Sequence, residues 1–412
     1  MNGVTSCRGQ LRAQLREVYE ARTQIKEAES RSRLDREIAR LTSELPPTTE
    51  TPHLGPYDAA ELQKRLLKSS KRALLAYFWG DSIVYGWKLT GNSSLGVPLG
   101  TADSLADLVA FFRTTIERPA HDSLWRGAAR RVYQRLITPL APEQPEQLLV
   151  ITDGPLAHIP LEALLPTDSA RPWGATQRII YGPSASVLAE VAQTPGNDRW
   201  DRAMLAVGNP ESTDGPGAAG SVLRTDKTAE LSPLPYAEQE ARALRDLFQS
   251  NGADLLTGRR ASVSQWLGLE PARYRYLHFA AHAQVSDRNP EQTHLVLAGG
   301  GLDLAAIRRL RLRSELVTLS ACETALGRRV RGEGVLGLSH AFLAAGARAT
   351  LVTLWRIEDR STAEFMQDFY RQLHDGRPPA EALLAVRHRW ITTGGRYAHP
   401  AYWAPFVLVG GM

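Results

Sequence analysis

Two residues that could carry out nucleophilic chemistry each end an apolar run in the second half of the chain. His282 ends the run YRYLHFAAH, and Cys322 ends the run ELVTLSAC. A thiol is a useful nucleophile at neutral pH when a neighbouring base or cation favours its thiolate, and an imidazole can play either role. Backbone N–H groups just beyond such runs can stabilise the oxyanion of a tetrahedral intermediate. If the two runs are adjacent parallel strands, the sequence predicts a Cys322/His282 dyad.

Each of these residues also has a structural interpretation. A lone cysteine at the end of an apolar strand is most often a small buried hydrophobe, so spacing alone leaves both interpretations of Cys322 open. His278 is expected in the core or behind the catalytic residues, and Cys7 is expected to be incidental. Spacing dictates no third catalytic residue. The histidines and the two cysteines lack the spacing of metal ligands, and no phosphate-binding loop follows a strand, so we expect neither a metal nor a cofactor.

The elements that must position these residues form a regular pattern from residue 147 onward. Apolar runs alternate with helical segments such as 236–248 and 362–373, which predicts an α/β fold with a mostly parallel sheet and helices on both faces. In such a sheet ligands bind outside the carboxyl ends of the strands. The Gly-, Ser- and Pro-rich segment 211–233 is expected to be a surface loop. The apolar runs are 147–153, 178–182, 202–209, 274–282, 315–322, 349–355 and 406–410.

The preceding residues divide into two expected parts. Residues 1–56 form a helical amino-terminal extension and linker, in which apolar positions recur at three- and four-residue steps over 9–45 until Pro46 and Pro47. This segment is either a solvated amphipathic helix packed on the chain or a docking segment for a regulatory protein. Residues 57–145 form an α+β part, with helices expected at 58–71, 103–118 and 121–140 and two strands around the turn Gly80–Asp81.

Composition excludes several classes of protein. The chain has 412 residues, of which 43% are hydrophobic and 23% charged, which fits a soluble globular protein and excludes a disordered one. A net charge of +5 is too small over this length to argue for nucleic-acid contact. Two cysteines exclude a disulfide-stapled secreted scaffold. We recognise no export signal and no membrane-spanning segment, so we expect a cytoplasmic protein without nucleic-acid or membrane partners.

Several sequence blocks resemble the CHAT domain, a caspase-like peptidase domain related to separase and the caspases. They are YLHFAAHAQVSDRNP, LVTLSACETALG, GEGVLGLSHAFLAAGARATLVTLW and HPAYWAPFVLVG, preceded by ITDGPLAHIPLEALL and YGPSASVL. The likeness covers residues 60–410 and is densest over 274–410. It implies a caspase-like α/β fold with an α-helical amino-terminal extension, in which 146–412 is the peptidase domain. It also matches His282 and Cys322 to the catalytic pair of a cysteine endopeptidase with protein substrates, of the kind that bacteria use in defence or cell death.

The resemblance assigns expected roles to three acidic residues. Asp359, in LWRIED, matches the separase position whose Asp lines the pocket for a basic P1 side chain; a helix N-cap is the alternative. Asp153, in ITDG, could add negative charge to the same crevice, although an Asp-Gly turn is the simpler account. Glu333, in GEG, is expected to organise the loop after Cys322 or to contact the substrate.

Two further features bear on the expected activity. Many relatives have Gly directly after the catalytic His, where this chain has Ala283. The backbone N–H groups of Ala283 and Cys322 can still hold an oxyanion unless the turn requires a positive φ. The short basic loop at 328–331 is either solvated or a self-cleavage site. The main alternative function is a catalytically silent CHAT-fold interaction scaffold, against which the retained His and Cys count.

Overall fold

The computed structural model describes residues 56–119, 122–140, 145–193, 199–211, 234–284, 293–320 and 337–412, together with seven single residues between 14 and 40. Cys322, Glu333 and the basic loop at 328–331 lie outside these ranges. Cys7, most of the 9–45 segment and residues 212–233 lie outside them as well.

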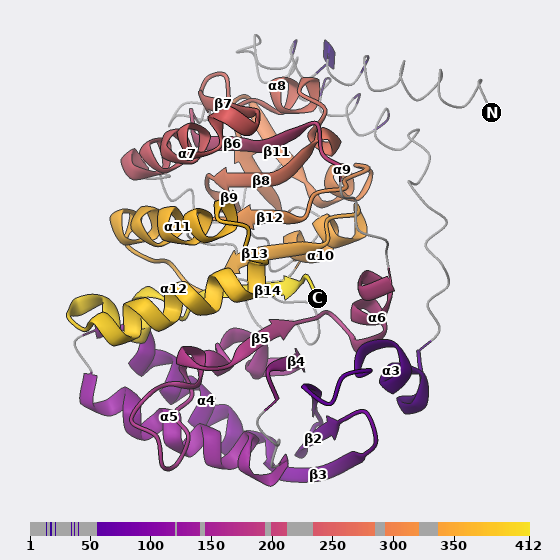
Figure 1. Cartoon of the computed structure of the whole chain (residues 1–412), viewed down its shortest axis with the longest axis vertical. Coiled ribbons are helices and arrows are strands. Elements are labelled where there is room, and N and C mark those ends of the chain that lie inside the picture. Colours follow the sequence, from indigo (N-terminus) through magenta and orange to yellow (C-terminus); the bar gives the residue numbers. More distant parts are fainter. Residues whose placement is uncertain are drawn as a thin grey trace.

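One mixed sheet of eleven strands forms the centre of the described structure (Figure 1). Its strand order is β3-β2-β1-β4-β5-β14-β13-β12-β8-β6-β7. The first block comprises β1, β4, β5 and β14, which are parallel to one another. The second block comprises β13, β12, β8, β6 and β7, also mutually parallel. The bounds are β1 Arg72–Trp79, β4 Gln147–Ile151, β5 Arg178–Tyr181, β14 Phe406–Gly410, β13 Ala349–Thr353, β12 Leu316–Leu319, β8 Tyr274–Ala280, β6 Arg202–Pro210 and β7 Ala253–Gly258.

The two blocks run in opposite directions. Strand β14 is antiparallel to β13, and in Figure 1 the arrows of β8, β12 and β13 point one way while those of β5 and β14 point the other. The expected α/β fold with a mostly parallel sheet is confirmed. A consequence that the strand pattern did not predict is that the carboxyl ends of the two blocks lie at opposite edges of the sheet.

Helices flank the sheet because each can bury its apolar face against the strands. In α11 the buried side chains recur at three- and four-residue steps, the spacing of one helix face. Helix α7 packs on β6 and on α11, and α11 also packs on α12. The helices are α3 Ala59–Leu66, α4 Ala102–Glu117, α5 Asp122–Leu136, α6 Ala185–Gln193, α7 Pro235–Leu247, α8 Val263–Gly268, α9 Leu304–Arg308, α10 Gly337–Ala344, α11 Asp359–His374 and α12 Pro379–Thr393.

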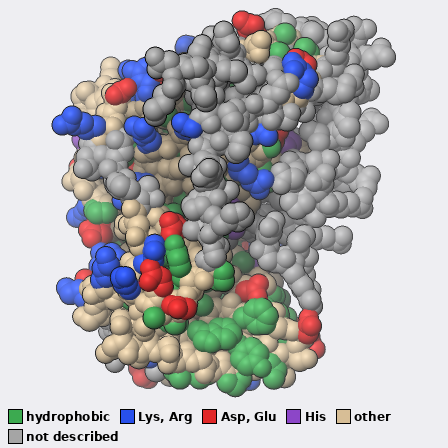
Figure 2. Space-filling model, turned by 90° about the vertical axis from the view of Figure 1, so that its right-hand side faces the viewer, with side chains coloured by type: hydrophobic (Ala, Val, Ile, Leu, Met, Phe, Trp, Pro, Cys, Tyr) green, Lys and Arg blue, Asp and Glu red, His purple; other side chains and the backbone are tan. Residues whose placement is uncertain are grey.

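The sheet continues across the domain boundary that we expect at 145/146, since β1 pairs with β4. Two antiparallel strands, β2 (Ile83–Leu89) and β3 (Ser94–Thr101), extend this end of the sheet. This end of the sheet has an apolar, exposed outer face: Phe78 of β1 and Tyr85 and Trp87 of β2 are among the exposed large hydrophobic residues, and Figure 2 shows hydrophobic side chains gathered at the lower end of the molecule. Trp87 lies over Gly96, where a Cβ would come within 2.8 Å of the indole nitrogen.

A small separate sheet lies beyond the end of β8. It consists of the antiparallel strands β9 (Ala283–Gln284), β10 (His294–Leu297) and β11 (Gly300–Asp303). Among the described residues, no helix combines the length and hydropathy that a membrane crossing requires.

Candidate active site

The strand ends that carry the expected dyad are neighbours. Strands β8 and β12 are parallel and hydrogen-bonded, with Leu319 opposite Phe279. The next amide, that of Ser320, donates to the carbonyl of Phe279 at 2.9 Å. His282 follows Phe279 by three residues, and Cys322 follows Leu319 by the same number. The expected adjacency of the two strands is confirmed, whereas Cys322 itself lies outside the described residues.

The backbone around His282 is fixed by the small sheet. The Val296 amide donates to the His282 carbonyl at 2.8 Å, and Ala283 stands opposite Leu295 in the β9–β10 ladder. Because bonded and non-bonded pairs alternate in an antiparallel ladder, the Ala283 N–H points away from β10. Among the described non-glycine residues only Asn209 and Glu270 have a positive φ. Ala283 therefore adopts its position without the left-handed conformation that glycine favours.

Asp359 lies at the start of α11, on the same side of the sheet as His282. It is the first residue of the helix, and Glu358 occupies the N-cap position. Its Oδ2 accepts a hydrogen bond from the Tyr236 amide at 2.8 Å. Tyr236 is the second residue of α7, whose first-turn amides have no partner within the helix. One interpretation made Asp359 the N-cap of its own helix, and this is wrong because Glu358 holds that position. Asp359 instead caps the neighbouring helix α7.

The electrostatic surroundings of Asp359 connect it to the candidate site. Burial is the main cause that raises the pKa of Asp359 above its ordinary value, and the nearby Glu240 carboxylate raises the pKa further. The Tyr236 amide and attraction to His282 and Arg356 act in the opposite direction. The structure therefore brings Asp359 within electrostatic range of His282, in a partly buried environment that disfavours its charge.

Asp153 lies elsewhere. It follows β4, and since the first block runs opposite to the second, its strand ends at the other edge of the sheet. Its Oδ2 accepts from the Trp79 amide and its Oδ1 from the Gly154 amide, both at 2.8 Å. Gly154 has a φ of +57°, as an Asp-Gly turn requires. The structure does not bring Asp153 to Asp359 and His282, and both of its oxygens are used by the local backbone.

A buried polar chain lies beneath the candidate site and joins four elements. Nε2 of His278 lies 2.7 Å from Oε1 of Glu240, and Nδ1 lies 3.2 Å from the Tyr370 hydroxyl. The Tyr370 hydroxyl donates to Thr318 at 2.7 Å. His278 is fully buried, as expected of a core histidine. Glu240 is not among the site residues expected from the sequence. Its position indicates burial all the same, because a glutamate stands in the apolar stripe of α7, between Ala237 and Leu244.

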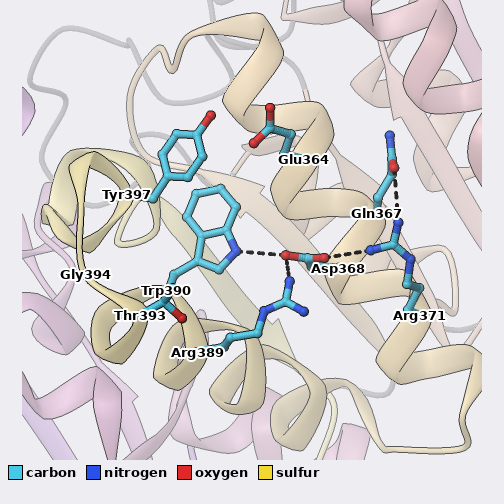
Figure 3. Close-up of a pocket in the computed structure, with 9 residues that line it drawn as sticks. All are labelled: Glu364, Gln367, Asp368, Arg371, Arg389, Trp390, Thr393, Gly394 and Tyr397. Carbon is cyan, nitrogen blue, oxygen red and sulfur yellow. Dashed lines mark hydrogen bonds and ion pairs between the residues drawn. The ribbon is translucent and has the colours of Figure 1, made fainter.

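A pocket of about 330 Å³ lies apart from these strand ends and is lined by residues of α11, of α12 and of the segment that follows α12 (Figure 3). Asp368 lies at its centre and accepts hydrogen bonds from Trp390 at 2.9 Å and Arg371 at 2.8 Å. Arg389 forms an ion pair with the same carboxylate. These polar groups satisfy one another. Within the described part of the chain, no cluster of three or more His, Cys, Asp or Glu residues could hold a metal ion.

The fold has a known counterpart. The crystal structure of the separase–securin complex of Saccharomyces cerevisiae matches with a TM-score of 0.51 at 10% sequence identity, over 85% of this chain and 31% of that chain. This likeness shows a caspase-like α/β fold. The family model of the CHAT domain matches residues 126–411, and the chain belongs to this family.

Two curated relatives share part of the sequence. Tetratricopeptide repeat protein 28 of Mus musculus is 36% identical over 126 residues, which is 31% of this chain and 5% of that protein. The Homo sapiens protein of the same name is 34% identical over 126 residues. The chain thus corresponds to a small fraction of the length of these relatives.

Proposed function

We propose that this protein is a cysteine endopeptidase whose catalytic pair is Cys322 and His282. The observation that carries the proposal is the ladder between β8 and β12, in which both residues follow a paired position by three residues. Membership of the CHAT family, with its caspase-like fold, supports the same assignment.

The chemistry needs only groups of this chain and a water molecule. The Cys322 thiolate attacks the scissile carbonyl carbon, and the oxyanion accepts hydrogen bonds from the amides of Ala283 and Cys322. His282 gives its proton to the leaving amine as the C–N bond breaks, which leaves a thioester. His282 then takes a proton from water, whose oxygen attacks the thioester and releases the carboxylic acid and the Cys322 thiolate, so that the starting pair is restored.

The proposed substrate is a protein cut after a basic residue. Asp359, partly buried and in the field of His282, would form the acidic base of the S1 pocket. A carboxylate can bind a guanidinium through two charge-assisted hydrogen bonds but holds an ammonium as a point charge, so Arg should be preferred over Lys. We assign Glu333 to the organisation of the loop that follows Cys322, or to substrate contact, and we leave Asp153 out of the pocket.

A peptide-library cleavage profile tests this function. Wild-type protein should cut after Arg and should react with a thiol-directed peptide probe, whereas Cys322→Ala should do neither. Cys7→Ser, which keeps the proposed nucleophile, should behave like wild type. If the wild-type thiol does not react and no peptide is cut, the alternative of a silent interaction scaffold is correct.

We also propose that the 9–45 segment docks a regulatory protein, as securin is bound in the separase–securin complex. Its apolar spacing with interleaved Arg and Glu residues supports this role. Removing residues 1–45 should leave a folded protein with altered basal cleavage or altered partner binding. An insoluble truncation would instead show that the segment is part of the core.

A further inference from the structure

A third strand of the second block ends beside the candidate dyad. Strand β6 is parallel to β8 and lies on the side of β8 away from β12. Val207 pairs with Phe279, and Gly208 pairs with Ala280. The next residue on β6 is Asn209, one step beyond the last pair, while His282 lies two residues beyond Ala280. Adjacent strands are about 4.8 Å apart, a separation that a carboxamide and an imidazole can span between them.

The backbone at Asn209 has an unusual conformation. Its φ is +46°, and the ladder with β7 is irregular between Gly208 and Pro210. A non-glycine residue in this region costs free energy and persists only where the surroundings impose it. Bulges of this kind recur beside active sites, where they redirect a side chain.

Packing on both sides imposes this conformation. Helix α7 passes so close to Gly208 that a Cβ there would come within 2.6 Å of the Ala241 Cβ. On the other side Pro210 pairs with Gly258, and the Glu211 amide donates to the Gly258 carbonyl at 3.1 Å. The bulge is therefore a fixed feature that determines where the Asn209 side chain is presented.

The Asn209 carboxamide is partly buried, and no residue that the structure describes forms a hydrogen bond with it. A carboxamide offers two donors and an acceptor, and leaving these unused in a partly buried position is costly. The second non-glycine residue with positive φ, Glu270, differs in place: it precedes β8 and so lies at the opposite edge of the sheet.

We propose that Asn209 is a positioning residue for His282. In the catalytic arrangement its Oδ1 would accept a hydrogen bond from one imidazole N–H of His282, a bond that the described structure does not contain. This bond would fix the ring orientation and leave the other ring nitrogen for the thiol. The inference rests on the proposed peptidase function. Three adjacent parallel strands, β12, β8 and β6, would then supply a nucleophile, a base and a group that orients the base, the arrangement that nucleophilic catalysis requires.

Substitution by glycine separates this role from a structural one. Asn209→Gly removes the carboxamide but accepts the positive φ without strain, so the melting temperature should not fall. Misorientation of the base should lower kcat for an Arg peptide about 100-fold, with KM nearly unchanged. Glu270→Gly is the matched control, because it makes the same backbone change at the other edge; it should leave kcat at the wild-type value.

A second variant should shift the pH profile of kcat/KM, an effect that a purely structural role of Asn209 would not produce. Asn209→Asp keeps the acceptor and tolerates the same φ, so it should restore most of kcat. Its carboxylate favours the imidazolium, so the alkaline limb of the kcat/KM profile should move to higher pH. An unshifted limb together with a low kcat would contradict the hydrogen bond.

The rate of alkylation of Cys322 by iodoacetamide, measured without substrate, distinguishes a failure of the positioning role of Asn209 from a failure of the dyad itself. If wild type cleaves peptides and Asn209→Gly keeps full kcat, or changes KM alone, the positioning role is overturned and the dyad stands. If wild type neither cleaves peptides nor alkylates faster than the His282→Ala variant, the dyad and the positioning role fall together. Slower alkylation and a low kcat in Asn209→Gly, with wild-type stability, support both.

Discussion

The two blocks of the sheet use polar residues at their carboxyl edges differently. In the first block Asp153 has both carboxylate oxygens bound to backbone amides of its own edge. In the second block Asp359 binds one amide from another helix and lies in the field of His282, while Asn209 has no hydrogen-bond partner among the described residues. A polar residue at a strand end is therefore a candidate for function only when some of its hydrogen-bonding atoms are not bound to nearby backbone groups.

A buried polar contact packs against each block, and the two contacts differ in the partner of the carboxylate. Against the first block Arg387 of α12 lies 3.0 Å from Glu162, whose other oxygen accepts from the Tyr181 hydroxyl at 2.7 Å. Against the second block the partner of Glu240 is His278. An arginine is always charged, so the first contact pairs two permanent charges. The second contact instead joins an imidazole nitrogen to a carboxylate beneath the candidate site.

The largest expected effect is on peptidase activity, which should depend on the carboxyl edge of the second block and not on that of the first. Cys322→Ala and His282→Ala should each remove nearly all peptidase activity, and the double variant should be little worse, because members of a catalytic unit are not additive. Asp153→Ala should keep kcat and KM, since its carboxylate serves only local amides. It should instead lower the free energy of unfolding by about 1–2 kcal/mol, the ordinary cost of a lost cap. Steady-state cleavage of an Arg peptide and denaturant titration measure both quantities.

Two outcomes would break this contrast. Full activity in Cys322→Ala would remove the dyad, and a loss of activity in Asp153→Ala at wild-type stability would return Asp153 to the site. A Cys7→Ser variant controls for general effects of losing a thiol.

The second prediction concerns the S1 pocket. Asp359→Asn keeps an oxygen that can accept from the Tyr236 amide but removes the charge that a P1 guanidinium needs. An unpaired buried cation costs about 3–5 kcal/mol, so kcat/KM for cleavage after Arg should fall by two orders of magnitude or more. Alkylation of Cys322 by iodoacetamide should continue. Cleavage after Asp or after apolar residues in the wild-type library would contradict the pocket assignment.

The sequence was sufficient for the fold because the informative strands are buried on both sides. Runs such as those of β12 and β13, buried at every position, read as continuous apolar segments between helices. Edge strands have a weaker apolar pattern. Strand β3 contains glycines and a proline, and β7 has one buried residue, so the sequence pattern predicts neither strand. The reversal between β13 and β14 had no sequence signal at all, because a strand that is buried reads the same in either direction.

The candidate site was predictable only in part, because an apolar run identifies a buried strand but not its direction in the sheet. His282 and Cys322 follow strands that the apolar pattern identifies. Asp153 could add charge to the same crevice only if its strand ran in their direction, and the simpler account, an Asp-Gly turn, is the one that the structure contains. The conformation of Asn209 depends on the packing of α7 on Gly208 and on the pairing of Pro210, which are contacts between segments far apart in the chain. No local pattern encodes such contacts.

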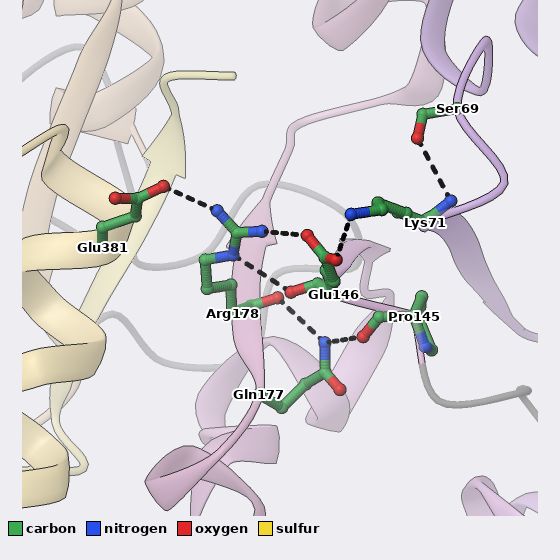
Figure 4. A network of polar contacts seen from close by, with 7 residues as sticks. All are labelled: Ser69, Lys71, Pro145, Glu146, Gln177, Arg178 and Glu381. Carbon is green, nitrogen blue, oxygen red and sulfur yellow. Dashed lines mark hydrogen bonds and ion pairs between the residues drawn. The ribbon is translucent and has the colours of Figure 1, made fainter.

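The third prediction compares two glutamates of the first block that differ in burial. Glu162 is fully buried with Arg387, and Glu162→Gln should cost about 3–5 kcal/mol of the free energy of unfolding because it strands a buried charge. Glu146 binds Lys71 at 2.6 Å and Arg178 at 3.2 Å in an exposed network (Figure 4). Glu146→Gln should cost less than about 1 kcal/mol.

Neither variant should change kcat, because both residues flank β4, in the block whose carboxyl edge carries no proposed chemistry. Equal losses of stability, measured by urea titration, would contradict the distinction between the two pairs. A double variant, Glu162→Gln with Arg387→Met, should recover part of the loss by removing the stranded cation.

The last expected effect is on stability and not on catalysis: it is a pH dependence that His340 in α10 and Asp359 in α11 control with opposite signs. Burial, helped by Arg308, lowers the pKa of His340 from 6.5 to about 4. Its contribution to stability is therefore complete above pH 6.5 and is lost as the pH falls toward 4, to an extent of roughly 3 kcal/mol. The raised pKa of Asp359 acts the other way, since its contribution is complete at low pH and is lost as the pH rises through its folded-state pKa.

Melting temperatures between pH 4 and pH 7 separate the two residues. His340→Gln should flatten the decline on the acid side and leave the neutral side unchanged. Asp359→Asn should raise the melting temperature at pH 7, and this gain should shrink as the pH falls through the raised folded-state pKa of Asp359. The charge on Asp359 that the proposed S1 pocket requires is then also a charge that destabilises the fold. If Asp359→Asn instead lowers stability at pH 7, its bond to the Tyr236 amide outweighs the cost of burying its charge, and Asp359 resembles Asp153 more than the comparison of the two edges allows.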